Sequence, residues 1–321
     1  MLSVLLKAGA RFPSVSPCFQ SYPQFEKIPV RPFLLCHTQG MRTQQPLWRA
    51  RAQLTTPPAS PHEAQHTVCI LVSSPCGGVG TSTFAALLAL AARQFTSSVA
   101  LVDRDPRNGG LDVLLGIEEE KGLRWSGLEA PLGTLDYQAL AVQLPRWKSV
   151  AVLSADPWNG VIENPWEKEA VYAALTRAFS VLIIDAGTEH AAPAIVRHAG
   201  DEARVSITRV ELLPLSILAC ARMRGVLAHE KFSPPAGFVA CTPRGGSAQV
   251  NVKDAEEWLA LPCLGKLNWE AKISRNMQRG TGLHPSARLQ QMACAVLEAL
   301  LEGVRRRELV EEKAGEQDAA Q

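Results

Sequence analysis

The chain has 321 residues, of which 46% are hydrophobic and 20% charged, the composition of a globular protein with a buried core. No uninterrupted apolar stretch reaches the ~18 residues that a membrane-spanning helix needs, so no such helix is expected. The net charge is +2, and residues 1–60 hold seven basic side chains against one acidic side chain. The rest of the chain is therefore mildly acidic, which excludes a general electrostatic attraction for nucleic acid.

The first 65 residues differ from the rest of the chain. They contain nine prolines and show no sustained helical or strand period. The apolar run at residues 1–6 is too short for the core of a secretory signal, and Lys7 follows it instead of preceding it. The basic composition is similar to that of a transit peptide. We interpret residues 1–65 as a disordered, proline-rich leader, or as a truncated N-terminal region whose true start lies nearer Met41.

From residue 66 onward, apolar strands alternate with helical patterns, which predicts a doubly wound α/β domain with a mainly parallel sheet and helices on both faces. Strands are predicted at residues 68–73, 98–103, 150–154, 181–185, 205–208, 237–241 and 263–267. Helices are predicted at residues 81–94, 111–115, 166–178, 215–229, 253–259, 271–278 and 286–304. We expect the domain to span residues 66–304, with a charged, frayed tail at residues 305–321.

A glycine-rich turn joins the first predicted strand to the first predicted helix. Its sequence is Ser73-Ser74-Pro75-Cys76-Gly77-Gly78-Val79-Gly80-Thr81-Ser82-Thr83. The glycines let backbone N–H groups turn inward, and the start of the helix adds free N–H groups and its dipole, so the segment is suited to bind an anion. The hydroxyl of Ser82 takes the position that would contact Mg²⁺ beside phosphates. Read alone, the turn is equally compatible with a tight connection that binds nothing.

Acidic residues end two other predicted strands. Asp103 and Asp105 follow an apolar run, and Asp185 ends another before Ala186 and Gly187. Ligands bind at the carboxyl ends of the strands in an open parallel sheet, where acids can hold Mg²⁺ or position an attacking water. The alternative for Asp103 and Asp185 is that they only cap turns.

The chain from about residue 67 to residue 302 resembles the MinD/ParA group of P-loop ATPases with a deviant Walker A loop, and most closely the CpaE-like septum-site-determining proteins. The blocks that carry the resemblance are residues 102–119, 123–128, 150–155, 261–267 and 273–280. The resemblance implies ATP and Mg²⁺ as ligands, an ATP-linked homodimer, and a cytoplasmic role with protein partners that place the division or secretion machinery. CpaE-like proteins usually carry a receiver-like domain first, for which residues 1–65 are too few.

The resemblance also implies roles for individual residues. Asp105 would orient the attacking water with the help of Asp103, and Asp185 would be the Walker B acid that holds Mg²⁺ together with Ser82. The phosphate-binding residues would be Gly77, Gly78, Val79, Gly80, Thr81, Ser82 and Thr83.

Three positions depart from the family pattern. Pro75 replaces a glycine, Cys76 replaces the lysine that reaches a partner subunit's phosphates, and Thr81 replaces the general phosphate-loop lysine. A charge-assisted hydrogen bond contributes about 1.5–3 kcal/mol, so losing one ground-state lysine weakens binding by about 10- to 100-fold. A cation in a phosphoryl-transfer site contributes about 10³–10⁵ in rate. We therefore predict weak nucleotide binding with slow or absent ATP hydrolysis.

Several alternatives stay open. The chain is either such a nucleotide-binding regulator, a pseudo-ATPase scaffold that binds only protein partners, or an ATPase that uses Arg104 or Arg107 as a substitute cation. A serine hydrolase using His190 is disfavoured because no G-x-S-x-G elbow is present. Membrane contact through residues 286–321 is the less favoured reading of the last helix. The eight scattered cysteines form no CxxC pair and are interpreted as free thiols of a reducing compartment.

Overall fold

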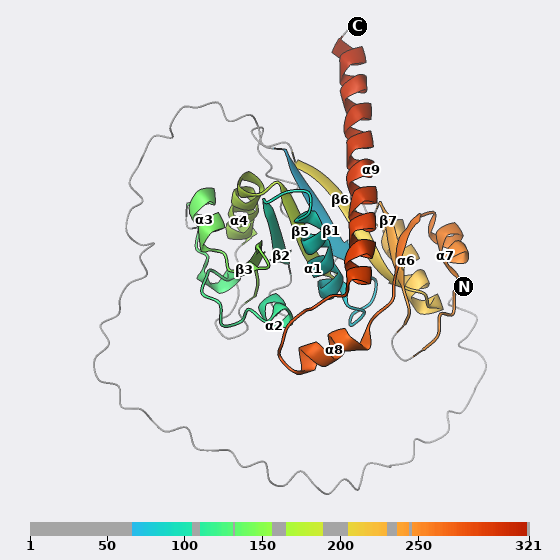
Figure 1. Cartoon of the computed structure of the whole chain (residues 1–321). Coiled ribbons are helices and arrows are strands. Elements are labelled where there is room, and N and C mark those ends of the chain that lie inside the picture. The colour runs from blue at the N-terminus through green and yellow to red at the C-terminus, as the bar shows by residue number, and fades with distance from the viewer. Residues whose placement is uncertain are drawn as a thin grey trace, which may run out of the picture. The chain divides into compact units, whose positions relative to one another are not determined.

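A computed structural model describes residues 66–104, 110–130, 132–155, 165–188, 205–229, 236–243 and 246–319, with side chains as far as residue 310. Its centre is an eight-stranded sheet in the order β3-β4-β2-β5-β1-β6-β7-β8 (Figure 1). Neighbouring strands are parallel except for the antiparallel pair β3 and β4. The strands are β1 Thr67–Ser73, β2 Val99–Asp103, β3 Arg146–Trp147, β4 Val150–Leu153, β5 Val181–Gly187, β6 Val205–Pro214, β7 Gly237–Cys241 and β8 Cys263–Leu267.

Helices cover both faces of this sheet, which confirms the predicted doubly wound α/β fold. Alternate side chains of β1 point to opposite faces: Ile70 and Val72 pack with α1 and α9, whereas Cys69 and Leu71 pack with α4. Helices α6 and α7 cover β6 and β7. The helices are α1 Thr81–Ala92, α2 Leu111–Leu115, α3 Tyr137–Gln143, α4 Pro165–Ala178, α6 Ile217–His229, α7 Val252–Leu259, α8 Ala271–Gln278 and α9 Ala287–Ala319.

The central strands are apolar throughout because they are covered on both sides. All five residues of β2 are buried, and so are all residues of β1 except the half-buried Val68. Helix α1 is buried around most of its circumference, with ten of its twelve residues inaccessible, because it lies between the sheet and α9. This packing fixes both ends of α1, including the end that carries the glycine-rich turn.

Two expectations about element bounds were wrong. Strand β6 continues to Pro214, well beyond the predicted end at residue 208. The prediction stopped before the charged Arg209 and Glu211, but both residues are buried within the strand. Helix α9 continues to Ala319, beyond the predicted end at residue 304. Its extension is held at Glu308, which pairs with His66 at 2.9 Å and also contacts Ser206.

Three short elements had no counterpart in the predicted set: α3, β3 and the 3₁₀ helix Trp125–Gly127. None of the described helices has both the length and the apolar character that crossing a membrane requires. The six cysteines of the described ranges are free thiols: Cys69, Cys76, Cys220, Cys241, Cys263 and Cys294.

Candidate functional site

The glycine-rich turn runs from the end of β1 to the start of α1 and is open. Gly78 and Gly80 have φ angles of 73° and 98°, a region that favours glycine. Gly77 and Gly78 are exposed, and a Cβ built on either would meet no atom within 4 Å. The space around these two glycines is therefore open, and a ligand can approach the backbone there.

The first turn of α1 leaves its N–H groups available to that space. Gly80 is the N-cap and has no side chain that could accept a hydrogen bond, and the first turn holds no acidic residue. The N–H groups of a helix's first turn have no partner within the helix, and the helix dipole makes this end positive. Thr81 is buried and Ser82 half-buried at this position. The arrangement suits a phosphate.

Trp269, in the loop between β8 and α8, packs against the turn. A Cβ on Gly80 would lie 2.4 Å from Cζ2 of the Trp269 indole, so no larger residue fits without displacing the ring. Nothing in the local sequence around Trp269 predicts this contact, because it joins two segments that are far apart in the chain.

Two of the predicted acids lie side by side. Asp103 at the end of β2 is in register with Asp185 of β5, and the two side chains are 3% and 5% exposed. Leu101 and Ile183, two positions before these acids in their strands, pack against α1. Residues two positions apart in a strand point to the same face, so both carboxylates lie on the α1 side of the sheet. The N–H of Gly187 donates to Asp185 Oδ1 at 3.2 Å. Asp105, Arg107 and His190 lie outside the described residues.

A buried polar network holds the end of β2. The indole Nε1 of Trp125 donates to the carbonyl oxygen of Asp103 at 2.7 Å. Arg124 Nε donates to Asp112 Oδ2 at 3.1 Å, and the Asp112 N–H donates to Ser154 Oγ at 3.1 Å. These bonds tie α2 and the 3₁₀ helix Trp125–Gly127 to the strand end that carries Asp103.

We expect Trp125→Phe to destabilise the domain by about 1–3 kcal/mol, because it keeps most of the buried ring but removes the indole N–H that donates to the Asp103 carbonyl. The measurement is the free energy of unfolding in urea. Trp258→Phe is the matched control, since Trp258 is 50% exposed and its replacement should change stability by less than about 0.5 kcal/mol. Equal stability of both variants would contradict the assigned role of this hydrogen bond.

A second buried group lies beneath the start of the turn, on the opposite face of the sheet. Ser73 Oγ donates to Glu211 Oε1 at 2.7 Å, and Arg209 Nε lies 3.2 Å from the same oxygen. Glu211 is fully buried and Arg209 is 2% exposed. The last residue of β1 is therefore anchored by a charged pair that the sequence did not indicate.

The side of the turn near Cys76 faces α6. Arg222 of that helix donates from Nη1 to the Sγ atom of Cys76 at 3.7 Å. Burial raises the pKa of the Cys220 thiol, and raises that of Cys241 to about 12, with the nearby Cys76 adding to both shifts. These two thiols are therefore neutral at physiological pH, and they supply no thiolate beside the turn.

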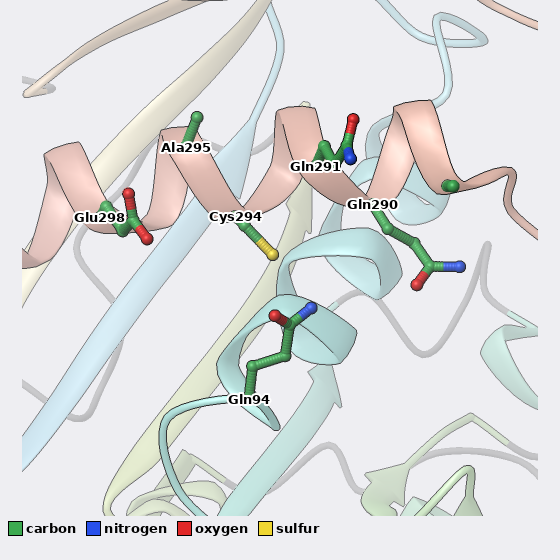
Figure 2. Close-up of a pocket in the computed structure, with 7 residues that line it drawn as sticks. Gln94, Gln290, Gln291, Cys294, Ala295 and Glu298 are labelled. Carbon is green, nitrogen blue, oxygen red and sulfur yellow. The ribbon is translucent and has the colours of Figure 1, made fainter.

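A hollow of about 350 Å³ lies away from the turn, between the end of α1 and helix α9 (Figure 2). Cys294 points toward Gln94 there, and its pKa is raised by burial and by the charge of Glu298. A neutral thiol among amides offers no nucleophile. The hollow lies at the opposite end of α1 from the candidate site, and we assign it no part in that site.

Comparisons with known proteins agree with this fold. A model of the CobQ/CobB/MinD/ParA nucleotide binding domain matches residues 70–283. An uncharacterised protein of Mycobacterium tuberculosis, recorded in two strains, is 29% identical over 212 residues, which make up 64% of this chain. The chain spans about half the length of these curated relatives, since the match covers 55% of them.

Solved structures share the fold at low sequence identity. A ParA family ATPase from Chlorobium tepidum is matched with a TM-score of 0.57 and 16% identity, over 72% of this chain and 98% of that one. MinD from Pyrococcus horikoshii, solved with Mg-ADP, is matched with a TM-score of 0.51 and 17% identity, over 73% and 95%. The MinC:MinD complex of Aquifex aeolicus gives 0.52 and 18%, over 74% and 96%. These similarities establish the α/β P-loop fold.

Proposed function

Because the chain belongs to the CobQ/CobB/MinD/ParA nucleotide binding domain family, we propose that residues 66–304 bind ATP weakly at the glycine-rich turn and hydrolyse it slowly or not at all. The observation that carries the proposal is the open turn at an uncapped helix start, with two buried carboxylates on the same face of the sheet. Residues 77–83 are assigned to the phosphates.

The chain also offers the groups that Mg²⁺ prefers. The Ser82 hydroxyl and the Asp185 carboxylate are hard oxygen ligands at adjacent strand and helix ends. When bound, the ion would neutralise phosphate charge. Asp103 and Asp105 are assigned to the position beside the terminal phosphate, where a carboxylate orients water.

The slow or absent hydrolysis follows from the residues at two lysine positions. Neither Cys76 nor Thr81 has a basic side chain, and Thr81 is only 8% exposed, so neither supplies the cation that developing negative charge requires. We propose that the protein is a CpaE-like regulator in the cytoplasm, which acts on septum placement or on a pilus or secretion assembly. Support comes from the fold it shares with MinD, which is solved in complex with MinC. Like ATP-linked family members, it would form a homodimer and bind protein partners.

A pseudo-ATPase scaffold is the second candidate, favoured by the absence of both lysines. Titration of the full chain with ATP and Mg²⁺ by calorimetry separates the two. We expect saturable binding that Ser82→Ala weakens in the presence of Mg²⁺ but not in its absence. A dissociation constant of about 1 mM corresponds to a binding free energy of about −4 kcal/mol. If no binding is detected at about 1 mM ATP, only the scaffold remains. Rapid phosphate release in a parallel assay would instead indicate a competent ATPase with a substitute cation.

A further inference from the structure

The contact between α6 and the glycine-rich turn places a cation at the position where the family lysine is missing. Arg222 Nη1 lies 3.7 Å from Cys76 Sγ, although the two residues are 146 positions apart in the chain. Cys76 itself packs against the apolar cluster under α6, which includes Ala219 and Cys220. The guanidinium therefore lies at the beginning of the turn because the fold brings α6 there.

The thiol is a poor partner for this guanidinium. A cysteine sulfur accepts hydrogen bonds only weakly, and an arginine side chain has five N–H donors. Within the described residues, the bond to Cys76 is the only hydrogen bond that the Arg222 side chain makes, and it forms no ion pair there. Arg222 is also exposed. Most of its donors are thus free to turn to an anion that enters the turn.

We infer that Arg222 binds the phosphates of a nucleotide held in the glycine-rich turn, and so replaces from a neighbouring helix the charge that Cys76 and Thr81 lack. The inference rests on the proposed function of the turn. A guanidinium matches phosphate oxygens with two parallel hydrogen bonds, so a single arginine provides both charge and orientation.

Of the two arginines considered from the sequence, Arg107 lies outside the described residues and Arg104 lies elsewhere. Arg104 follows β2, and its backbone N–H donates to the carbonyl oxygen of Asp185 at 3.0 Å. Strand β2 is separated from β1 by β5, whereas α6 follows β6, the direct neighbour of β1 on the other side. Arg222 therefore approaches the turn from the side of Cys76, and Arg104 from the side of the carboxylates.

The test compares ATP affinity in Arg222→Ala and in Arg224→Ala, with Mg²⁺ present. Arg224 is exposed on the same helix and, two residues along, projects in a different direction, so it is a matched control for charge and helix propensity. We expect Arg222→Ala to weaken ATP binding by about 10- to 100-fold and Arg224→Ala to leave it unchanged. Arg222→Lys should retain part of the affinity. Circular dichroism melts check that all variants stay folded.

A second pair of variants separates phosphate binding from support of the turn. Cys76→Ala removes the thiol contact and should keep wild-type ATP affinity, whereas Cys76→Lys should restore affinity to Arg222→Ala. If the wild type binds ATP and Arg222→Ala binds as tightly, the inference is overturned while the proposed function stands. Equal losses in Arg222→Ala and Arg224→Ala would also overturn it, since they would indicate a non-specific charge effect. If the wild type binds no nucleotide, both are rejected.

Discussion

Replacing Glu211 by leucine should destabilise the domain by about 3–5 kcal/mol, because it removes one partner of the buried ion pair with Arg209. The carboxylate is fully buried, lies 3.2 Å from Arg209 Nε and accepts a hydrogen bond from Ser73. The loss is expected in the free energy of unfolding measured in urea. Because Ser73 ends β1, the same variant should also loosen the start of the glycine-rich turn and weaken ATP binding.

The double variant Arg209→Met/Glu211→Leu is the informative control. Replacing both members of a buried ion pair by apolar residues of similar volume is often close to neutral. Glu302→Ala is the control for an exposed pair, since Glu302 contacts Arg306 at the surface of α9, where such pairs contribute about 0–1 kcal/mol. If Glu211→Leu is as stable as the double variant, the buried charge of Arg209 is not the cause of the loss of stability.

The second large effect is expected from alanine at Gly80. The left-handed backbone costs an L-residue about 1–2 kcal/mol, and the clash of the new Cβ with Trp269 adds about 1–3 kcal/mol of overpacking. Gly78→Ala has the same kind of backbone strain but open space around its Cβ, so only the first cost applies. Gly77→Ala has neither and should keep wild-type stability. The thermal midpoints of the three variants should therefore fall in the order 77, 78, 80.

The same three variants report on the ligand. A methyl group at Gly77 or Gly78 occupies the open side of the turn, so Gly77→Ala should weaken ATP binding without lowering stability. This separation of affinity from stability is what a phosphate cradle predicts and a mere connection does not. If Gly77→Ala binds ATP as tightly as the wild type, the open side of the turn is not where the phosphates lie.

Local sequence patterns were sufficient for several elements of the fold. Strand β8 and helices α2 and α8 have the predicted bounds, because apolar runs and periodicity decide elements of this kind. Strand β3 has only two residues, too few for any period. The end of β6 was missed because Arg209 and Glu211 interrupt its apolar pattern, and their burial depends on contacts that the pattern does not show, among them their mutual pairing and the hydrogen bond from Ser73.

The same distinction between local patterns and contacts distant in the chain applies to the candidate site. The glycine-rich turn and the strand-end acids could be located because chain order alone places them, next to a helix start and at the carboxyl ends of parallel strands. Arg222, Trp269 and Glu211 could not, because their contacts join segments far apart in the chain. The hydrogen bond between Ser73 and Glu211, for example, spans 138 positions.

The indole packed on Gly80 has a consequence beyond its steric role. Trp269 lies close enough to the turn that an added methyl group would overlap its ring. We therefore expect a phosphate bound in the turn to change the polarity around this ring. The indole of Trp269 is a chromophore beside the position assigned to the ligand, so ligand binding in the turn is expected to change the fluorescence of the protein itself.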